Sequence, residues 1–184
     1  MNLISVDSGT IQLFGMKYQK DKSYICSKVG ALIEDPVFYS YMTGGQNANY
    51  IRKLRNLPES VLEETKRLTG LSDAWDKKVR GYSLGMKMRL ALGICLMGNP
   101  ELIILDEPMN GLDPDGIFAL KELIRSEKED GVTILISSHL LLELQELVDE
   151  FIFLKEGEVI KICENNDNIE QVYSEIYGDR KNSL

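Results

Sequence analysis

The fold of this chain is decided by the stretch Leu102-Ile103-Ile104-Leu105-Asp106-Glu107-Pro108. Four consecutive aliphatic residues are typical of a strand that is buried on both faces, as in a parallel sheet. The two carboxylates then fall at the carboxyl end of the strand, where open parallel sheets bind ligands. In a nucleotide hydrolase, Asp106 could hold Mg²⁺ while Glu107 polarises the attacking water. Two solvated acids at the end of a strand would explain the pair equally well.

A second motif, Tyr82-Ser83-Leu84-Gly85-Met86, lies about a helix's length upstream. Ser83 is placed to cap a helix that stops at Gly98-Asn99-Pro100. A hydroxyl, a glycine and free backbone N–H groups at the start of a helix form an anion site. An ordinary N-cap would have the same sequence.

Two further motifs come after the central stretch. In Gly111-Leu112-Asp113-Pro114, Asp113 can cap a helix that starts at the proline, and capping alone explains it. Ser137-Ser138-His139 comes directly after an apolar strand, which places His139, the only histidine, at the same sheet edge as the carboxylates. A single histidine in a chain more often has no functional role.

Composition excludes several classes of protein. The chain has 184 residues with 43% apolar content, enough for one compact domain. A formal charge of -8 with no basic block argues against nucleic acid as a partner. Three scattered cysteines suit a reducing compartment, so we expect a cytoplasmic protein. Without a long apolar run or a signal peptide, membrane association would come through a partner.

The rest of the chain falls into three parts. Residues 1–37 predict short strands at 10–14 and 28–33, and residues 38–80 predict helices. Thr43 with Gln46, and Ser60 with Glu63, have capping-box spacing, and Gly70 would end the second helix. Between Ser83 and Cys163 the pattern alternates helices with apolar strands, which predicts βα units and a largely parallel sheet. These strands are predicted near 102–105, 132–137, 151–154 and 159–163.

In this order and at these spacings, the motifs resemble the nucleotide-binding domain of ABC transporters, over nearly all of residues 5–163. The resemblance implies an α/β, P-loop NTPase-like (RecA-like) fold, in which a largely parallel sheet carries an inserted helical subdomain at about 38–97. It implies a single ABC ATPase domain over 1–163 and a polar tail over 164–184. The cofactors implied are ATP and Mg²⁺.

The resemblance also assigns roles to individual residues. Ser83 and Gly85 correspond to the signature motif, Asp106 and Glu107 to Walker B, Leu112 and Asp113 to the D-loop, and His139 to the switch histidine. Asp106 would then bind the metal, Glu107 and His139 would be catalytic, and Ser83, Gly85, Leu112 and Asp113 would contact nucleotide.

The variant signature YSLGMK is similar to that of the branch that exports bacitracin and lantibiotics. That branch also has a glutamate in place of the Q-loop glutamine, and Glu34 occupies this place, which implies contact with nucleotide and metal. Alone, Glu34 could be a surface acid before a proline turn. Met88 departs from the glutamine expected there.

The function implied is the ATP-binding subunit of an ABC transporter, which couples ATP hydrolysis to export, with antimicrobial peptides as the substrate class. Its partners would be a transmembrane permease and a second ATP-binding subunit, identical or different. It would lie in the cytoplasm on the inner face of the cell membrane, and a groove near Glu34 would receive a coupling helix of the permease.

One element of the family is absent, because no GxxxxGK[ST] loop occurs in the 184 residues. The segment Asp7–Gly15 resembles the family's segment just after the P-loop helix, so we expect the domain to lack its N-terminal strands and P-loop and not to bind ATP in cis. We expect the lost strand to leave Leu102–Leu105 with unpaired backbone groups, and the product to be unstable or to aggregate.

Three explanations are open. The chain is a late start or a fragment of an active ATPase, or a non-catalytic regulatory subunit that lends its signature motif to a complete partner. The third is a soluble ABC-type protein of translation or DNA repair, which the missing tandem domains and coiled-coil insertions disfavour.

Overall fold

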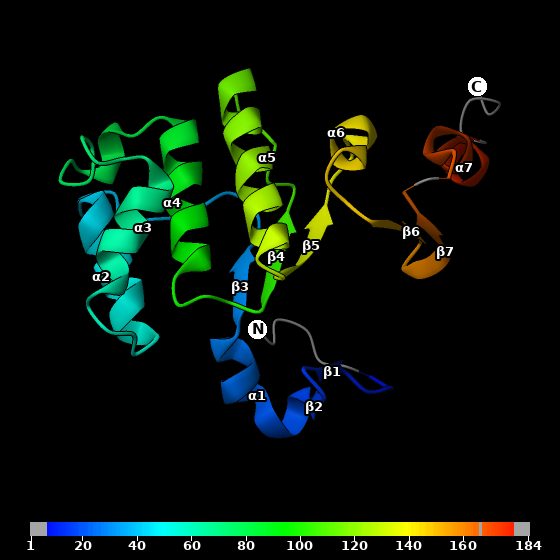
Figure 1. Ribbon diagram of the computed structural model, residues 1–184, viewed down its shortest axis with the longest axis horizontal. Helices are drawn as coiled ribbons and strands as arrows, with labels where there is room; N and C mark the ends of the chain where they lie inside the picture. The colour runs from blue at the N-terminus through cyan, green and yellow to red at the C-terminus, as the bar shows by residue number, and fades with distance from the viewer. Residues whose placement is uncertain (1–6, 166, 179–184) are drawn as a thin grey trace. The chain divides into compact units, whose positions relative to one another are not determined.

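The computed structural model describes residues 7–165 and 167–178, which form an α/β protein (Figure 1). The chain divides into two compact units, residues 1–137 and 138–184. The first unit holds β1 (Gln12–Leu13), β2 (Met16–Lys17), α1 (Tyr18–Ser27), β3 (Val29–Leu32), α2 (Gly44–Leu54), α3 (Val61–Thr69), η1 (Val79–Gly81), α4 (Leu84–Leu96), β4 (Leu102–Asp106), α5 (Pro114–Glu129) and β5 (Thr133–Ser137). The second holds α6 (Leu141–Gln145), β6 (Glu150–Lys155), β7 (Glu158–Glu164) and α7 (Ile169–Tyr177).

The sheet of the first unit is parallel, in the order β3-β4-β5. Leu105 of β4 pairs with Leu32 on one side and Ile136 on the other. The prediction of a buried central strand is confirmed, because Leu102, Ile103 and Leu105 are buried. The expectation that β4 would be left with unpaired backbone groups is wrong, since β3 and β5 cover both of its edges.

The open edges of this sheet lie instead on its two outer strands, β3 and β5. No strand in the described residues pairs with the side of β5 that faces away from β4. Its residues alternate between exposed and half-buried, and Leu135 is 51% exposed. An edge with exposed aliphatic side chains and no charge or proline is a site for pairing with another strand.

The sheet is covered by α4 and α5 (Figure 1). A side chain at Gly30 of β3 would collide with the carbonyl oxygen of Cys95, so glycine allows α4 to approach the strand closely. Leu120 and Ile124 of α5 are buried, and with Leu92 of α4 and Ile103 of β4 they line one small core cavity. These contacts pack α4 and α5 against the sheet.

A helical layer formed by α2, α3 and α4 has its own apolar core around Trp75, Tyr82 and Leu90. The capping box predicted at Thr43 is present, with reciprocal bonds to Gln46 of 2.9 and 3.1 Å. The one predicted at Ser60 is not, because Ser60 has helical dihedral angles and its side chain caps nothing, although α3 begins right after it. Gly70 ends α3 in the left-handed conformation, as predicted.

The second unit differs from the expected continuation of the parallel sheet. Both strands are near their predicted positions, but β6 and β7 pair antiparallel as a separate two-stranded sheet. The segment predicted as a polar tail contains α7, whose Ile169 and Val172 are buried. Tyr177 of this helix donates a hydrogen bond of 2.6 Å to the carbonyl oxygen of Leu154. The predicted domain limits at 163 and 164 stay predictions.

In the part of the chain that the structure describes, no helix has both the length and the apolar character needed to span a membrane.

Candidate functional site

One residue of the neighbouring strand, Ser137, holds both the side chain of Asp106 and the backbone of Glu107. Asp106 and Ser137 are register partners, and the Ser137 hydroxyl donates a hydrogen bond to Oδ1 of Asp106. The backbone N–H of Glu107 donates to both the hydroxyl and the carbonyl oxygen of Ser137, each at 3.1 Å. Ser137 was not among the predicted site residues, because the cross-strand register that brings it to Asp106 has no local sequence pattern.

Glu107 has a left-handed backbone, with φ of 47°. This conformation costs a non-glycine residue about 1 kcal/mol. The turn is fixed on both sides, because the Asn110 N–H donates to the Glu107 carbonyl oxygen at 3.1 Å and Pro108 is fully buried. The chain therefore turns sharply at the second carboxylate.

Ser83 begins α4 as predicted. Its hydroxyl accepts a hydrogen bond of 3.2 Å from the Met86 N–H. The preceding residue anchors this start, because the buried Tyr82 hydroxyl donates to the Ala74 carbonyl oxygen at 2.6 Å. Burial raises the pKa of Tyr82, so it stays protonated and keeps this bond. A Cβ at Gly85 would meet nothing within 4 Å, so packing does not require the glycine.

The loop after β4 lies against the start of α4. Gly111 has φ of +70°, and a Cβ there would come within 2.5 Å of Leu84 Cδ2. The structure therefore brings Leu112 and its neighbours close to the motif around Ser83. Asp113 caps α5, as its Oδ1 accepts a hydrogen bond of 2.9 Å from the Gly116 N–H.

The other two predicted site residues, Glu34 and His139, are exposed. Glu34 lies two residues beyond β3, whose last residue pairs with Leu105, so it falls at the same sheet edge as Asp106. His139 belongs to the second unit, and its role in the site stays a prediction.

The donor atoms at this edge fit Mg²⁺ only as part of a larger set. Carboxylate oxygens are hard ligands, and Mg²⁺ is commonly held by one or two carboxylates together with phosphate oxygens and water. Within the described residues, no three or more His, Cys, Asp or Glu side chains gather where they could hold a metal. Asp106 therefore fits a metal ion whose other ligands are water or the phosphates of a nucleotide. The N–H groups at the start of α4 can bind a phosphate group.

A groove of about 800 Å³ runs between β3, α2 and α4. Its rim carries Tyr39 and Tyr50, whose rings meet edge to face at 5.3 Å. The buried Asn47 fixes this rim, because its amide bonds both the N–H and the carbonyl oxygen of Tyr39, at 3.0 and 3.2 Å. The groove is thus an aromatic-edged surface with a rigid border.

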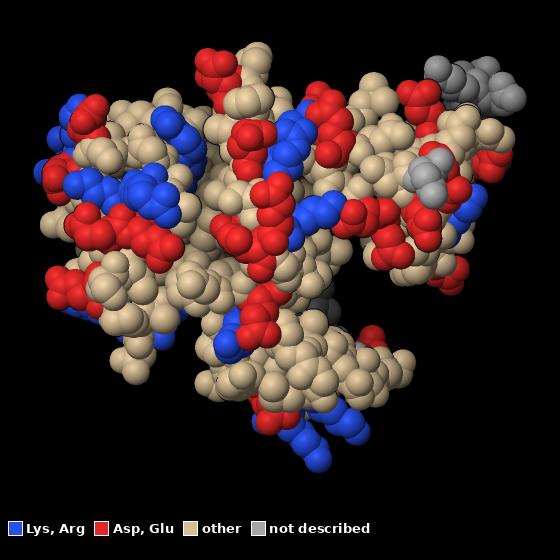
Figure 2. Space-filling model, viewed as in Figure 1, with Lys and Arg blue, Asp and Glu red and all other residues tan. Residues whose placement is uncertain are grey.

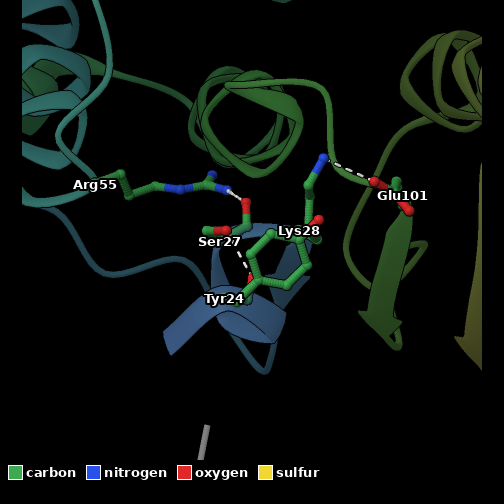
Figure 3. A network of polar contacts seen from close by, with 5 residues as sticks. All are labelled: Tyr24, Ser27, Lys28, Arg55 and Glu101. Carbon is green, nitrogen blue, oxygen red and sulfur yellow. Dashed lines mark hydrogen bonds and ion pairs between the residues drawn. The ribbon is translucent and has the colours of Figure 1, made fainter. Parts of the chain in front are cut away.

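Arg55 extends from the end of α2 into this groove and donates to the Ser27 carbonyl oxygen at 3.4 Å (Figure 3). Burial lowers its pKa. The nearby Lys28 pairs with Glu101 at 2.7 Å, whereas Arg55 has no carboxylate partner in the described residues. Because the Arg55 guanidinium is half-buried and, among the described residues, donates only to a carbonyl oxygen, it can also donate hydrogen bonds to a carboxylate.

Acidic and basic side chains are interspersed over the helical layer and α5 on the face drawn in Figure 2.

The chain matches a family model, curated relatives and a solved structure. The family model described as ABC transporter matches residues 1–110. A bacitracin transport ATP-binding protein of Enterococcus faecalis is 41% identical over 155 residues, which is 83% of this chain and 50% of that protein. A lantibiotic transport ATP-binding protein of Streptococcus pyogenes is 37% identical over 174 residues, 94% of this chain and 75% of that protein.

A solved structure of the ATP-binding subunit of an ABC transporter superposes with a TM-score of 0.84 at 24% identity, covering 95% of this chain and 79% of that one. This match shows the fold. The chain spans about half the length of the bacitracin relative.

Proposed function

Because the chain belongs to the ABC transporter family, we propose that it is an ATP-binding subunit that couples ATP hydrolysis to the export of antimicrobial peptides. The observation that carries this proposal is the arrangement at the end of β4, where Ser137 holds both the Asp106 carboxylate and the backbone of the adjacent Glu107. Relatives named for bacitracin and lantibiotic transport support the substrate class.

The residues at the carboxyl ends of the strands would have different roles in hydrolysis. Mg²⁺ held by Asp106, with Glu34 at the same edge, would neutralise charge on the phosphates. Glu107 would orient the attacking water and accept its proton, and His139 would orient the terminal phosphate. Glu107 sits at a turn whose N–H and C=O are both bonded, so its position requires little reorganisation.

The motif around Ser83 would act on a nucleotide held by a second ATP-binding subunit. The first N–H groups of a 13-residue helix carry partial positive charge, and the open space at Gly85 allows a phosphate to approach. Gly111 packs against Leu84, so a shift of Leu112 and Asp113 on nucleotide binding would also move the start of α4.

We further propose that the groove receives a helix of a transmembrane permease on the cytoplasmic face of the membrane. Support comes from its aromatic rim and from the half-buried guanidinium of Arg55, which suits a helix that has an apolar ridge and one carboxylate.

The test uses the complex as the producing cell assembles it. The chain is tagged in the genome and purified from solubilised membranes, and ATP turnover and the intact mass of the tagged chain are measured. We expect Glu107→Gln to lower turnover by about a hundredfold or more while ATP binding is retained. The matched control is Glu129→Gln at the exposed end of α5, which should turn over normally. Equal turnover by the wild type and Glu107→Gln would overturn the assignment of the base.

A further inference from the structure

Ser137 contacts both carboxylate positions at the end of β4. Its hydroxyl has one proton and two lone pairs. The hydroxyl donates its proton in a hydrogen bond to Oδ1 of Asp106, and one of its lone pairs accepts a hydrogen bond from the Glu107 N–H. A single side chain thus joins the last residue of β4 to the first residue of the turn after it.

The two bonds do not depend on the hydroxyl to the same degree. The Glu107 N–H also donates to the Ser137 carbonyl oxygen at 3.1 Å, so the turn keeps one bond to β5 without the hydroxyl. Oδ1 of Asp106 has the hydroxyl as its donor, and Oδ2 accepts no hydrogen bond from the described residues. Removal of the hydroxyl would therefore mainly affect the position of the Asp106 carboxylate.

We propose that Ser137 is a positioning residue for the metal site: its hydroxyl holds Oδ1 of Asp106, so that Oδ2 is the oxygen presented to a divalent cation. This inference rests on the proposed function only in assigning Asp106 to the metal. Because both bonds involve the Ser137 hydroxyl oxygen, they also link the Asp106 carboxylate to the Glu107 backbone.

The first experiment measures metal binding without turnover. The full chain is labelled with ¹⁵N, and broadening of the Asp106 and Glu107 amide signals is followed as Mn²⁺ is added. We expect Ser137→Ala to weaken Mn²⁺ binding by about tenfold, and Ser137→Thr, which keeps a hydroxyl, to bind within about twofold of the wild type. Ser126→Ala, which removes an exposed hydroxyl from α5, is the control and should bind as the wild type does.

In the tagged complex, Ser137→Ala should raise the Mg²⁺ concentration needed for half-maximal ATP turnover by a similar factor. Turnover at saturating Mg²⁺ should change less, because Glu107 keeps its bond to the Ser137 carbonyl oxygen. A residue that mattered only for folding would lower turnover at every Mg²⁺ concentration.

Three results would overturn the proposal: Mn²⁺ binding by Ser137→Ala equal to the wild type, no rescue by Ser137→Thr, or no Mn²⁺ effect at Asp106 in the wild type. Should Ser137→Ala fail to fold, hydrogen exchange of the Glu107 amide in the wild-type chain decides, since exchange at the rate of an open loop contradicts the bonds on which the proposal stands. Normal turnover by Glu107→Gln, with the Ser137 effects intact, would count against the proposed function alone.

Discussion

Ser83 and Asp113, which we propose to contact nucleotide, both cap helices. Each side-chain oxygen accepts a backbone N–H three residues on, at 3.2 Å for Ser83 and 2.9 Å for Asp113. A sequence selected only for helix capping would look the same at these positions. For that reason it is the order of the motifs along the chain that indicates the family, and neither residue does so alone.

Cys95 gives a prediction at this scale. Burial raises the pKa of its thiol to about 12, although it lies beside the groove. At pH 8 only about one thiol in ten thousand would be ionised, and the thiolate is the reactive form. We expect iodoacetamide to leave Cys95 unmodified in the folded chain and to alkylate it in denaturant, as measured by mass spectrometry of peptides. Cys95→Ser identifies the peptide, and rapid alkylation of the folded protein would contradict the expectation.

The contact of Ser137 with Asp106 could not be predicted from the sequence. Asp106, Glu107 and Ser83 could be found because each has a local pattern of apolar residues or caps around it. The contact between Ser137 and Asp106 depends on the pairing of strands that lie 31 positions apart, so only the register in three dimensions shows it.

Among the elements, the two helices predicted to begin with capping boxes form a natural comparison. Thr43 makes the box and Ser60 does not, although both sequences have the required spacing. We expect Thr43→Ala to lower the free energy of unfolding by about 1 kcal/mol. Ser60→Ala should change it by less than about 0.5 kcal/mol. Denaturant unfolding followed by circular dichroism measures both, and equal losses would mean that Ser60 caps α3 in solution.

Most elements were predictable, but their partners were less so. Runs of aliphatic residues locate β4, β5, β6 and β7 within one or two residues, because a strand's length and burial are local properties. Which strands pair is not local: β6 and β7 form their own hairpin, and β4 is flanked on both sides. Helix α7 was missed although Ile169, Val172 and Ile176 have the spacing of an amphipathic helix, because the composition of the last twenty residues is polar. Ile169 and Val172 are buried.

On the scale of the whole molecule, the proposed docking of a permease helix in the groove can be tested by charge reversal. Reversing the charge in Arg55→Glu should sharply reduce the amount of membrane protein that is purified with the tagged chain, because a carboxylate would then face a carboxylate. Lys53→Glu makes the same change on the exposed side of α2, away from the groove lining, and should leave recovery unchanged. Similar recovery with both variants would remove the groove from the interface.

The open edge of β5 predicts the behaviour of the 184-residue chain by itself. We expect it to associate as its concentration rises, because unpaired backbone groups and Leu135 form a template for another strand. Leu135→Lys should reduce association by placing a charge at that edge. Phe118→Lys replaces a more exposed side chain, 65% accessible on α5, and should not. Sedimentation velocity over a range of concentrations distinguishes the two, and equal effects would mean that general surface hydrophobicity drives association.

The left-handed backbone at Glu107 has an evolutionary consequence. Glycine would adopt φ of 47° without penalty, so every generation that keeps a glutamate there accepts a small loss of stability. In a library randomised at this codon, selection for abundance alone should enrich glycine and asparagine, whereas selection for transport should retain glutamate. Comparing the enrichment of glutamate in the two selections would show how strongly selection for transport outweighs selection for stability at this position.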